Sequence, residues 1–210
     1  KDVQFATGKY VDNKDVEKLD LLPQTITDET NIDQAVSAIM EAKNPILYVG
    51  GGVINSGDIA TGLLRELAAE TNFPVTSTLM GLGCYPASGK SWLGMLGMHG
   101  TYEANMTMHD CDLMVCIGAR FDDRITGRID AFSPESIKVH IDIDPSSINK
   151  NVSVDIPIVG DITDVLTKIL KKWRSKGAKT NQAEVNKWWK IIEGWREVKC
   201  LNYKNSKTVI

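Results

Sequence analysis

The sequence predicts a doubly wound α/β domain built around a parallel sheet. Short apolar runs recur along the chain, for example at residues 46–49 and 113–117, and each has the length of a strand buried on both faces. Segments with apolar side chains at helical spacing lie between these runs. Strands and helices that alternate in this way form parallel sheets, whose ligands bind just past the carboxyl ends of the strands.

The expected elements follow one another without an internal repeat. In chain order we expect a helix from residue 30, a strand at 46–49, a helix from 56, a strand at 73–78, a loop at 81–100, a helix at 101–109, strands at 113–117, 137–143 and 156–159, and a helix after 161. The loop at 81–100 holds six glycines and shows no regular periodicity. Loops of this length are uncommon inside compact domains and are usually functional.

Three parts are expected along the chain. Residues 1–30 are polar and predict a linker, residues 31–175 form the ligand-binding domain, and residues 176–210 carry a tryptophan-rich C-terminal helix. The apolar load of that helix predicts docking onto this domain or onto a neighbouring one. The chain begins with Lys1 rather than methionine, which indicates a segment of a longer protein.

Composition excludes several classes of function. A formal net charge of −3 gives no reason to expect nucleic acid or an anionic membrane as a partner. No apolar run approaches the roughly 20 residues that cross a bilayer, and the first residues do not show the pattern expected of a signal peptide. The four cysteines form no C-x-x-C pair and the three histidines lack zinc-site spacing, so we expect free thiols in a reducing compartment and no metal site.

A charged turn directly follows the strand at 113–117. It carries Arg120, Asp122, Asp123 and Arg124 within five residues. Guanidinium groups pair with phosphate through fixed planar donors, and the carboxylates can orient them or accept from a ligand hydroxyl. The alternative is a surface ion-pair cluster of little energetic value. The position at the carboxyl end of a strand favours ligand binding.

Two glycine-rich segments are further candidates. Residues 50–52 are three glycines between a strand and a helix, which let the backbone approach a phosphate, although a flexible turn explains them equally well. Their spacing is not G-x-G-x-x-G, which argues against an ordinary NAD dehydrogenase. Residues 96–100 place His99 among glycines, either to pack against a flat ligand or as a solvated histidine on a surface loop.

Two aspartates follow predicted strands. Asp142 ends the strand at 137–143, where an acidic side chain commonly holds a ribose or ribityl hydroxyl, although it can simply be a polar strand end. Asp161 follows Gly160 and suits either the same role or the N-cap of the next helix.

An ordered set of motifs resembles the acetolactate synthase (acetohydroxyacid synthase) catalytic-subunit family. The motifs are Lys-Asp-Val-Gln at 1–4, Gly-Gly-Gly at 50–52, Thr-Leu-Met-Gly-Leu-Gly at 78–83, Leu-Gly-Met-His-Gly at 96–100, Gly-Ala-Arg-Phe-Asp-Asp-Arg at 118–124 and His-Ile-Asp-Ile-Asp-Pro at 140–145. The resemblance covers most of residues 1–172. It implies the central, Rossmann-like and DHS-like domain of a thiamine-diphosphate enzyme, which in this family binds FAD without net redox chemistry.

The resemblance also implies which positions contact FAD. Residues 50–52 would approach the nucleotide by backbone, 78–80 and 96–99 would line the ribityl or isoalloxazine end, 118–125 would wrap the diphosphate, and 142–143 with 161–162 would hold the adenosine side. The implied contacts are Gly50, Gly51, Gly52, Thr78, Leu79, Met80, Leu96, Gly97, Met98, His99, Gly118, Ala119, Arg120, Asp122, Arg124, Ile125, Asp142, Ile143, Asp161 and Ile162.

For the parent enzyme, the resemblance implies a transferase of branched-chain amino-acid biosynthesis. It decarboxylates pyruvate and joins the remaining two-carbon unit to a second 2-oxo acid, either pyruvate or 2-oxobutyrate. Thiamine diphosphate and Mg²⁺ bind to flanking domains, and no Gly-Asp-Gly string of the metal-diphosphate motif occurs in these 210 residues. The isolated segment is therefore expected to scaffold and bind FAD without catalysing the reaction, and the C-terminal helix to lead to the thiamine-diphosphate domain.

The implied partners are the flanking domains, other large subunits in a homodimer or homotetramer, and a small regulatory subunit. The implied location is the bacterial cytoplasm, or an organelle in a eukaryote. Two alternatives remain at this point. One is the middle domain of a related thiamine enzyme such as pyruvate oxidase or glyoxylate carboligase, and the other is a stand-alone nucleotide-binding or regulatory module.

Overall fold

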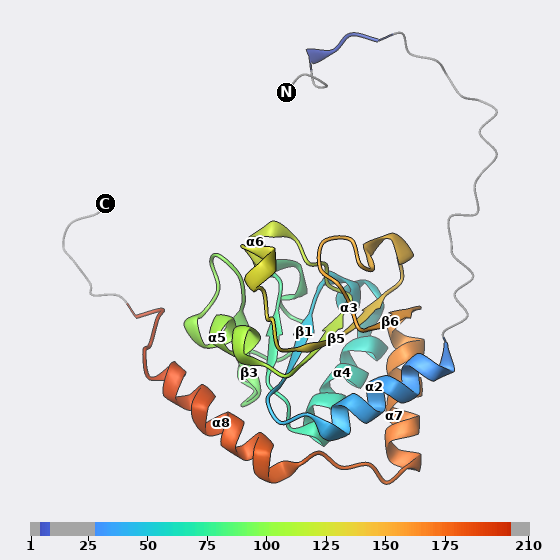
Figure 1. Cartoon of the computed structure of the whole chain (residues 1–210), viewed down its shortest axis with the longest axis vertical. Helices are drawn as coiled ribbons and strands as arrows, with labels where there is room; N and C mark the ends of the chain where they lie inside the picture. The colour runs from blue at the N-terminus through green and yellow to red at the C-terminus, as the bar shows by residue number, and fades with distance from the viewer. Residues whose placement is uncertain (1–4, 9–27, 203–210) are drawn as a thin grey trace.

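A parallel sheet with helices on both faces forms the body of the protein (Figure 1). The computed structural model describes residues 5–8 and 28–202. Within them, six strands lie in the order β3-β2-β1-β4-β5-β6, and every neighbouring pair is parallel. The strands are β1 (Pro45–Val49), β2 (Val75–Ser77), β3 (Trp92–Met95), β4 (Leu113–Ile117), β5 (Ile137–Asp142) and β6 (Ile156–Val159). The predicted doubly wound α/β fold is confirmed.

The strand order reverses between β1 and β4. From β1 the chain adds β2 and then β3 on one side, and it then crosses to add β4, β5 and β6 on the other. In sheets of this order the loops that leave the two central strands diverge, and the crevice between them is the usual ligand site. The topology therefore points to the loops after β1 and β4.

Four helices cover one face of the sheet. They are α2 (Glu29–Glu41), α3 (Gly51–Asn55), α4 (Gly57–Thr71) and α7 (Ile162–Ser175). Their apolar side chains form one core with alternate residues of the strands, such as Leu47, Val49 and Val115, all of which are fully buried. Asp28 and Asp161 cap the amino ends of α2 and α7 by accepting hydrogen bonds from backbone amides.

Two helices, α5 (Tyr102–Asp110) and α8 (Gln182–Arg196), cover the other face. The indole Nε1 of Trp188 donates to the carbonyl of Pro45 at 3.0 Å, and that of Trp189 donates to the carbonyl of Asn72 at 2.8 Å. Trp188 is buried and stacks edge-on against Trp195, with ring centroids 5.5 Å apart. The tryptophan-rich helix thus docks onto this domain, which was one of its two predicted destinations.

Short helical segments shape the connections. They are α6 (Asp123–Thr126), η1 (Leu79–Gly81), η2 (Ile129–Ala131) and η3 (Pro145–Ser147). None of the helices in the described residues has the length and apolar character needed to cross a membrane. The expected linker at 1–30 and the last residues of the C-terminal part lie mostly outside the described residues.

The prediction that residues 81–100 form a loop without regular structure is wrong for residues 92–95. They form β3, which pairs with β2 at the edge of the sheet. The strand is only four residues long, mostly half-buried, and contains Gly94 with φ +92°. Gly94 interrupts the apolar residues of this segment, so it shows neither a continuous apolar run nor an alternation of apolar and polar residues. The glycines at 51 and 52 begin the short helix α3, so the flexible turn that was one of their two interpretations is not observed.

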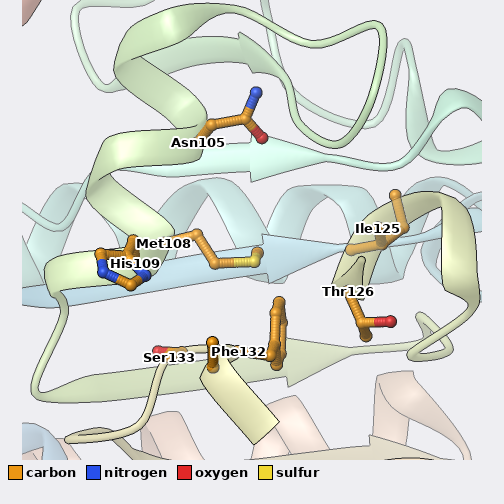
Figure 2. A pocket seen from close by; sticks show the side chains of 8 residues that line it. Asn105, Met108, His109, Ile125, Thr126, Phe132 and Ser133 are labelled. Atoms are coloured by element: carbon orange, nitrogen blue, oxygen red, sulfur yellow. The ribbon is translucent and has the colours of Figure 1, made fainter. Parts of the chain in front are cut away.

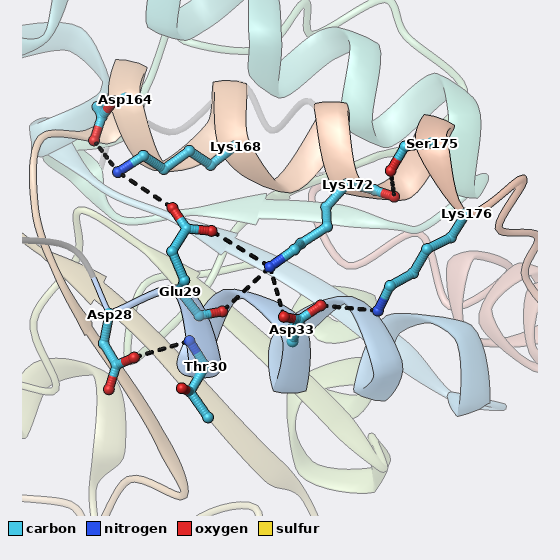
Figure 3. A network of polar contacts seen from close by, with 9 residues as sticks. All are labelled: Asp28, Glu29, Thr30, Asp33, Asp164, Lys168, Lys172, Ser175 and Lys176. Atoms are coloured by element: carbon cyan, nitrogen blue, oxygen red, sulfur yellow. Dashed lines mark hydrogen bonds and ion pairs between the residues drawn. The ribbon is translucent and has the colours of Figure 1, made fainter.

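Ion pairs fasten α2 to α7 across the surface of the domain (Figure 3). The carboxylate of Asp33 accepts from Lys172 Nζ and, at 2.9 Å, from Lys176 Nζ. Glu29 contacts Lys168 and Lys172. The hydrogen bonds from the two lysines lower the pKa of Asp33 below its ordinary value of 3.8.

We predict that Asp33→Asn lowers the thermal midpoint at neutral pH, because the substitution removes a carboxylate that is stabilised only in the folded state. A depressed pKa contributes stability above the unfolded-state value, and this contribution is lost as the pH falls through the folded-state value. The difference between wild type and variant should therefore be full above about pH 5 and shrink below pH 3.8. Calorimetry across this range measures it, with Asp130→Asn, in an isolated exposed pair with Arg128, as the control. A difference that persists at low pH would contradict the ionic explanation.

We further predict that Trp188→Ala destabilises the domain by about 3–5 kcal/mol, because it empties a buried site and leaves the Pro45 carbonyl without its donor. Urea unfolding followed by far-ultraviolet circular dichroism measures the loss. Ile191→Ala on the same helix, where the side chain is 48% exposed, should change stability by less than about 0.5 kcal/mol. Equal effects of the two substitutions would show that α8 is not anchored by its tryptophan face.

Candidate cofactor-binding site

The segments predicted to contact the cofactor all lie at the carboxyl edge of the sheet. Because the strands are parallel, their carboxyl ends meet at one edge, and each candidate segment directly follows a strand. Residues 50–52 follow β1, 78–80 follow β2, 96–99 follow β3, 118–125 follow β4, 142–143 end β5, and 161–162 follow β6. The fold thus brings together segments that are far apart along the chain.

The loops after β1 and β4 pack against each other backbone to backbone. A Cβ atom on Gly50 would lie 2.3 Å from the carbonyl oxygen of Gly118, and one on Gly52 would lie 2.8 Å from the Cα of Gly118. Gly118 itself has φ +58°, and the amide of Gly52 donates to its carbonyl at 3.0 Å. Glycine is therefore required at these positions by the contact between the two loops. Whether the same glycines also approach a ligand stays a prediction.

The loop after β2 lies against the end of β1. The amide of Thr78 donates to the carbonyl of Val49 at 2.9 Å, and the Thr78 hydroxyl accepts from the amide of Gly81 at 3.1 Å. This arrangement leaves Leu79 and Met80 at the surface, with 66% and 74% of each residue exposed.

The loop after β3 is fastened on two sides. Asn105 of α5 pairs with Gly97, accepting from its amide at 2.8 Å and donating to its carbonyl at 3.0 Å. The amide of Met98 donates to the carbonyl of Arg124 at 3.0 Å, which ties this loop to α6. Gly97 has φ +95°, and a Cβ there would lie 2.6 Å from that same carbonyl. Leu96 is buried beneath the loop, whereas Met98 and His99 are exposed.

Arg120 presents its guanidinium group at this edge. Its side chain is 62% exposed, and Nη2 donates to Oδ2 of Asp122 at 2.8 Å. An exposed pair of this kind adds little stability, and it engages only one of the five N–H donors that arginine carries. The side chain of Arg124 extends towards Met98, with Nη1 3.9 Å from its sulfur. Exposed cationic and apolar groups are therefore neighbours here.

The loop after β4 is held by three polar side chains, of which Tyr48 and His140 are buried and Asn151 is exposed. The Tyr48 hydroxyl donates to the carbonyl of residue 120 at 2.9 Å, and Nδ2 of Asn151 donates to that of residue 121 at 2.7 Å. The carbonyl of residue 119 accepts from Nε2 of His140 at 2.8 Å and from the thiol of Cys116 at 3.1 Å. The sequence pattern did not indicate these residues as part of the site. A tyrosine and a histidine inside apolar runs were the available signals, because such groups need partners when buried.

The two predicted aspartates differ in their surroundings. Asp142 is mostly buried; its Oδ1 accepts from the amide of Asp144 at 2.9 Å, and its Oδ2 lies 3.8 Å from Nε2 of His140. Asp161 caps α7, since its Oδ1 accepts from the amide of Thr163 at 2.8 Å. The N-cap alternative at Asp161 is therefore realised, and contact of either carboxylate with a sugar stays a prediction.

The two isoleucines beside these aspartates also differ. Ile143 is 50% exposed. Ile162 is buried below the loops, and its Cδ1 would lie 2.5 Å from a Cβ on Gly118. Ile162 therefore shapes the backbone contact, and Ile143 is available at the surface.

A hollow of about 150 Å³ lies beside the site, between α5 and α6 (Figure 2). It is lined by Asn105, Met108, His109, Ile125, Thr126, Ala131, Phe132 and Ser133. It is small for a dinucleotide, and Ile125 is the predicted contact that borders it. Across the described residues no group of three histidine, cysteine, aspartate or glutamate side chains is arranged to hold a metal ion.

The exposed groups at the carboxyl edge fit FAD by their chemistry. A diphosphate requires cationic or N–H donors, which Arg120 and Arg124 carry, and a flavin ring requires exposed apolar surface, which Leu79, Met80 and Met98 provide. These two kinds of surface meet where the strand order reverses.

Comparison with known proteins agrees with this geometry. The chain is 44% identical over 205 residues to the acetolactate synthase isozyme 3 large subunit of Escherichia coli, covering 97% of this chain and 35% of that protein. It is 48% identical over 179 residues to the acetolactate synthase large subunit of Haemophilus influenzae, covering 85% of this chain and 31% of that protein. The chain thus spans about a third of the length of these relatives.

The family model described as "Thiamine pyrophosphate enzyme, central domain" matches residues 32–169, which is well over half of the chain. The match begins in α2 and ends in α7, so it contains the whole sheet and every loop at its carboxyl edge. The chain therefore belongs to the thiamine pyrophosphate enzyme family and carries its central domain.

Proposed function

We propose that this chain is the central domain of an acetolactate synthase large subunit and that it binds FAD at the carboxyl edge of its sheet. The names of the relatives favour this function over pyruvate oxidase or glyoxylate carboligase. Their greater length favours a part of a larger enzyme over a stand-alone nucleotide-binding module. The single observation that carries the FAD proposal is the exposed Arg120 guanidinium at the strand-order reversal, beside exposed apolar side chains.

In this proposal the residues of the edge bind and orient FAD. The guanidinium groups of Arg120 and Arg124 pair with the diphosphate, and Asp122 holds the Arg120 side chain in position. Leu79, Met80 and Met98 cover the flavin end and exclude water from it. When bound, FAD supplies a flavin that undergoes no net redox change in the reaction.

The activity proposed for the intact enzyme is the condensation of two 2-oxo acids after decarboxylation of the first. Thiamine diphosphate and Mg²⁺ are assigned to flanking domains of the longer chain, and this domain holds those domains in place. The words "large subunit" in the relatives' names support assembly with further large subunits and a small regulatory subunit. The bacterial origin of these relatives supports a cytoplasmic location.

We predict that FAD raises the thermal midpoint of the intact native chain in a concentration-dependent way and that NAD does not. A ligand that binds only the folded state stabilises it by about 2.7 kcal/mol when present at a hundredfold excess over its Kd. Differential scanning fluorimetry with each nucleotide measures the shift. A shift with NAD, or no shift with either nucleotide, would contradict the proposed cofactor.

We predict that Arg120→Ala weakens FAD binding roughly 10- to 100-fold, because charge-assisted hydrogen bonds contribute about 1.5–3 kcal/mol each. Arg128→Ala is the matched control, since Arg128 is also an exposed arginine paired with an aspartate but lies after α6. Equilibrium titration by flavin fluorescence compares the two variants with the wild type. Unchanged affinity in Arg120→Ala would contradict the phosphate assignment.

A further inference from the structure

Three consecutive carbonyl groups after β4 accept hydrogen bonds from side chains of other segments. Those of residues 119, 120 and 121 accept from the side chains of His140, Tyr48 and Asn151, at 2.8, 2.9 and 2.7 Å. We call these three side chains the carbonyl clasp. They come from β5, from β1 and from the segment before β6, and two of those strands are the direct neighbours of β4 in the sheet.

Each clasp residue can act only as a donor in these bonds. A carbonyl oxygen only accepts, so the His140 ring carries its proton on Nε2. Burial lowers the pKa of His140 and raises that of Tyr48, and both effects keep the groups uncharged. His140 and Tyr48 are fully buried, and Phe121 packs edge-on against His140 with ring centroids 5.1 Å apart. Two of the three clasp residues therefore belong to the core, and Asn151 completes the clasp from the surface.

Fixing these carbonyls also fixes the amides that follow them. In a trans peptide the C=O and N–H bonds of one unit point in opposite directions, and no cis peptide occurs in the described residues. The N–H groups of residues 120, 121 and 122 therefore point away from the clasp. Among the bonds of the described residues, none of these three amides donates to a protein acceptor. These three N–H groups are therefore available to donate to a bound anion.

We propose that the carbonyl clasp positions the loop after β4 so that the amides of residues 120–122, together with the Arg120 guanidinium, receive the diphosphate of FAD. Tyr48, His140 and Asn151 are positioning residues, because they act through the backbone and touch no ligand. The inference rests on the proposed FAD function and names the residues that hold this loop in its binding position. It also explains why buried polar side chains are present in strands that are otherwise apolar.

The experiment is a set of FAD titrations on the intact native chain. Tyr48→Phe removes only the donating hydroxyl, and Asn151→Ala removes a donor at the surface, where folding is not at risk. Each should raise the Kd for FAD about three- to tenfold, which corresponds to one neutral hydrogen bond. Thr71→Val is the matched control: it deletes a buried hydroxyl that donates to the Leu67 carbonyl at 2.7 Å in α4, and it should leave the Kd unchanged.

A pair of His140 variants separates positioning from general stability. His140→Gln keeps an N–H donor and should retain most of the FAD affinity, whereas His140→Leu should lose it. FAD should slow amide hydrogen exchange at residues 120–122 in the wild type and in Thr71→Val, and should slow it less in Tyr48→Phe.

The outcomes distinguish the two proposals. If the wild type does not bind FAD, the proposed function fails and the inference fails with it. If the wild type binds FAD and all clasp variants bind it equally well, the clasp alone is overturned. Equal losses in His140→Gln and His140→Leu, or in Tyr48→Phe and Thr71→Val, would also overturn it.

Discussion

The close contact between the loops after β1 and β4 is the constraint on which the rest of the structure depends. The amides of Gly50 and Gly52 donate to the carbonyls of Ile117 and Gly118, both at 3.0 Å. No Cβ fits at Gly50 or Gly52 without moving the opposite backbone. Because the strand order reverses between these two strands, the same contact forms the floor of the carboxyl edge and sets where the neighbouring loops can lie.

The two edges of the sheet have different surfaces. At the amino edge, Trp188 of α8 closes over the first residue of β1 and donates to its carbonyl. At the carboxyl edge, the last residues of the same strand lead into glycines, and the side chains around them are exposed apolar and charged groups. The tryptophans of the C-terminal helix thus cover part of the amino edge of the sheet. The other edge carries unsealed apolar surface, which is typical of a ligand or domain contact.

Much of the fold and of the site edge follows from local patterns in the sequence. The strands at 113–117 and 156–159 were predicted with the bounds that the structure shows, since each is a short apolar run. Only the first is buried on both faces, and the second lies at the edge of the sheet. The strand β3 was not predicted, because four mostly half-buried residues at an edge give no such run. The clasp was also missed, because Tyr48 and its acceptor are 72 positions apart, and such pairings depend on the completed sheet.

The glycines at 50 and 52 have a structural role in the contact between two loops. A run of three glycines after a strand suggests a phosphate-binding backbone, yet Gly50 and Gly52 are already required by the packing of two loops. The buried Ile162 side chain fills the remaining space beside Gly118. These residues build the floor, and exposed side chains such as those of Arg120 and Met80 are available to a ligand above it. The glycines therefore set the shape of the site. Its choice of ligand depends on the polar and apolar groups that this shape exposes.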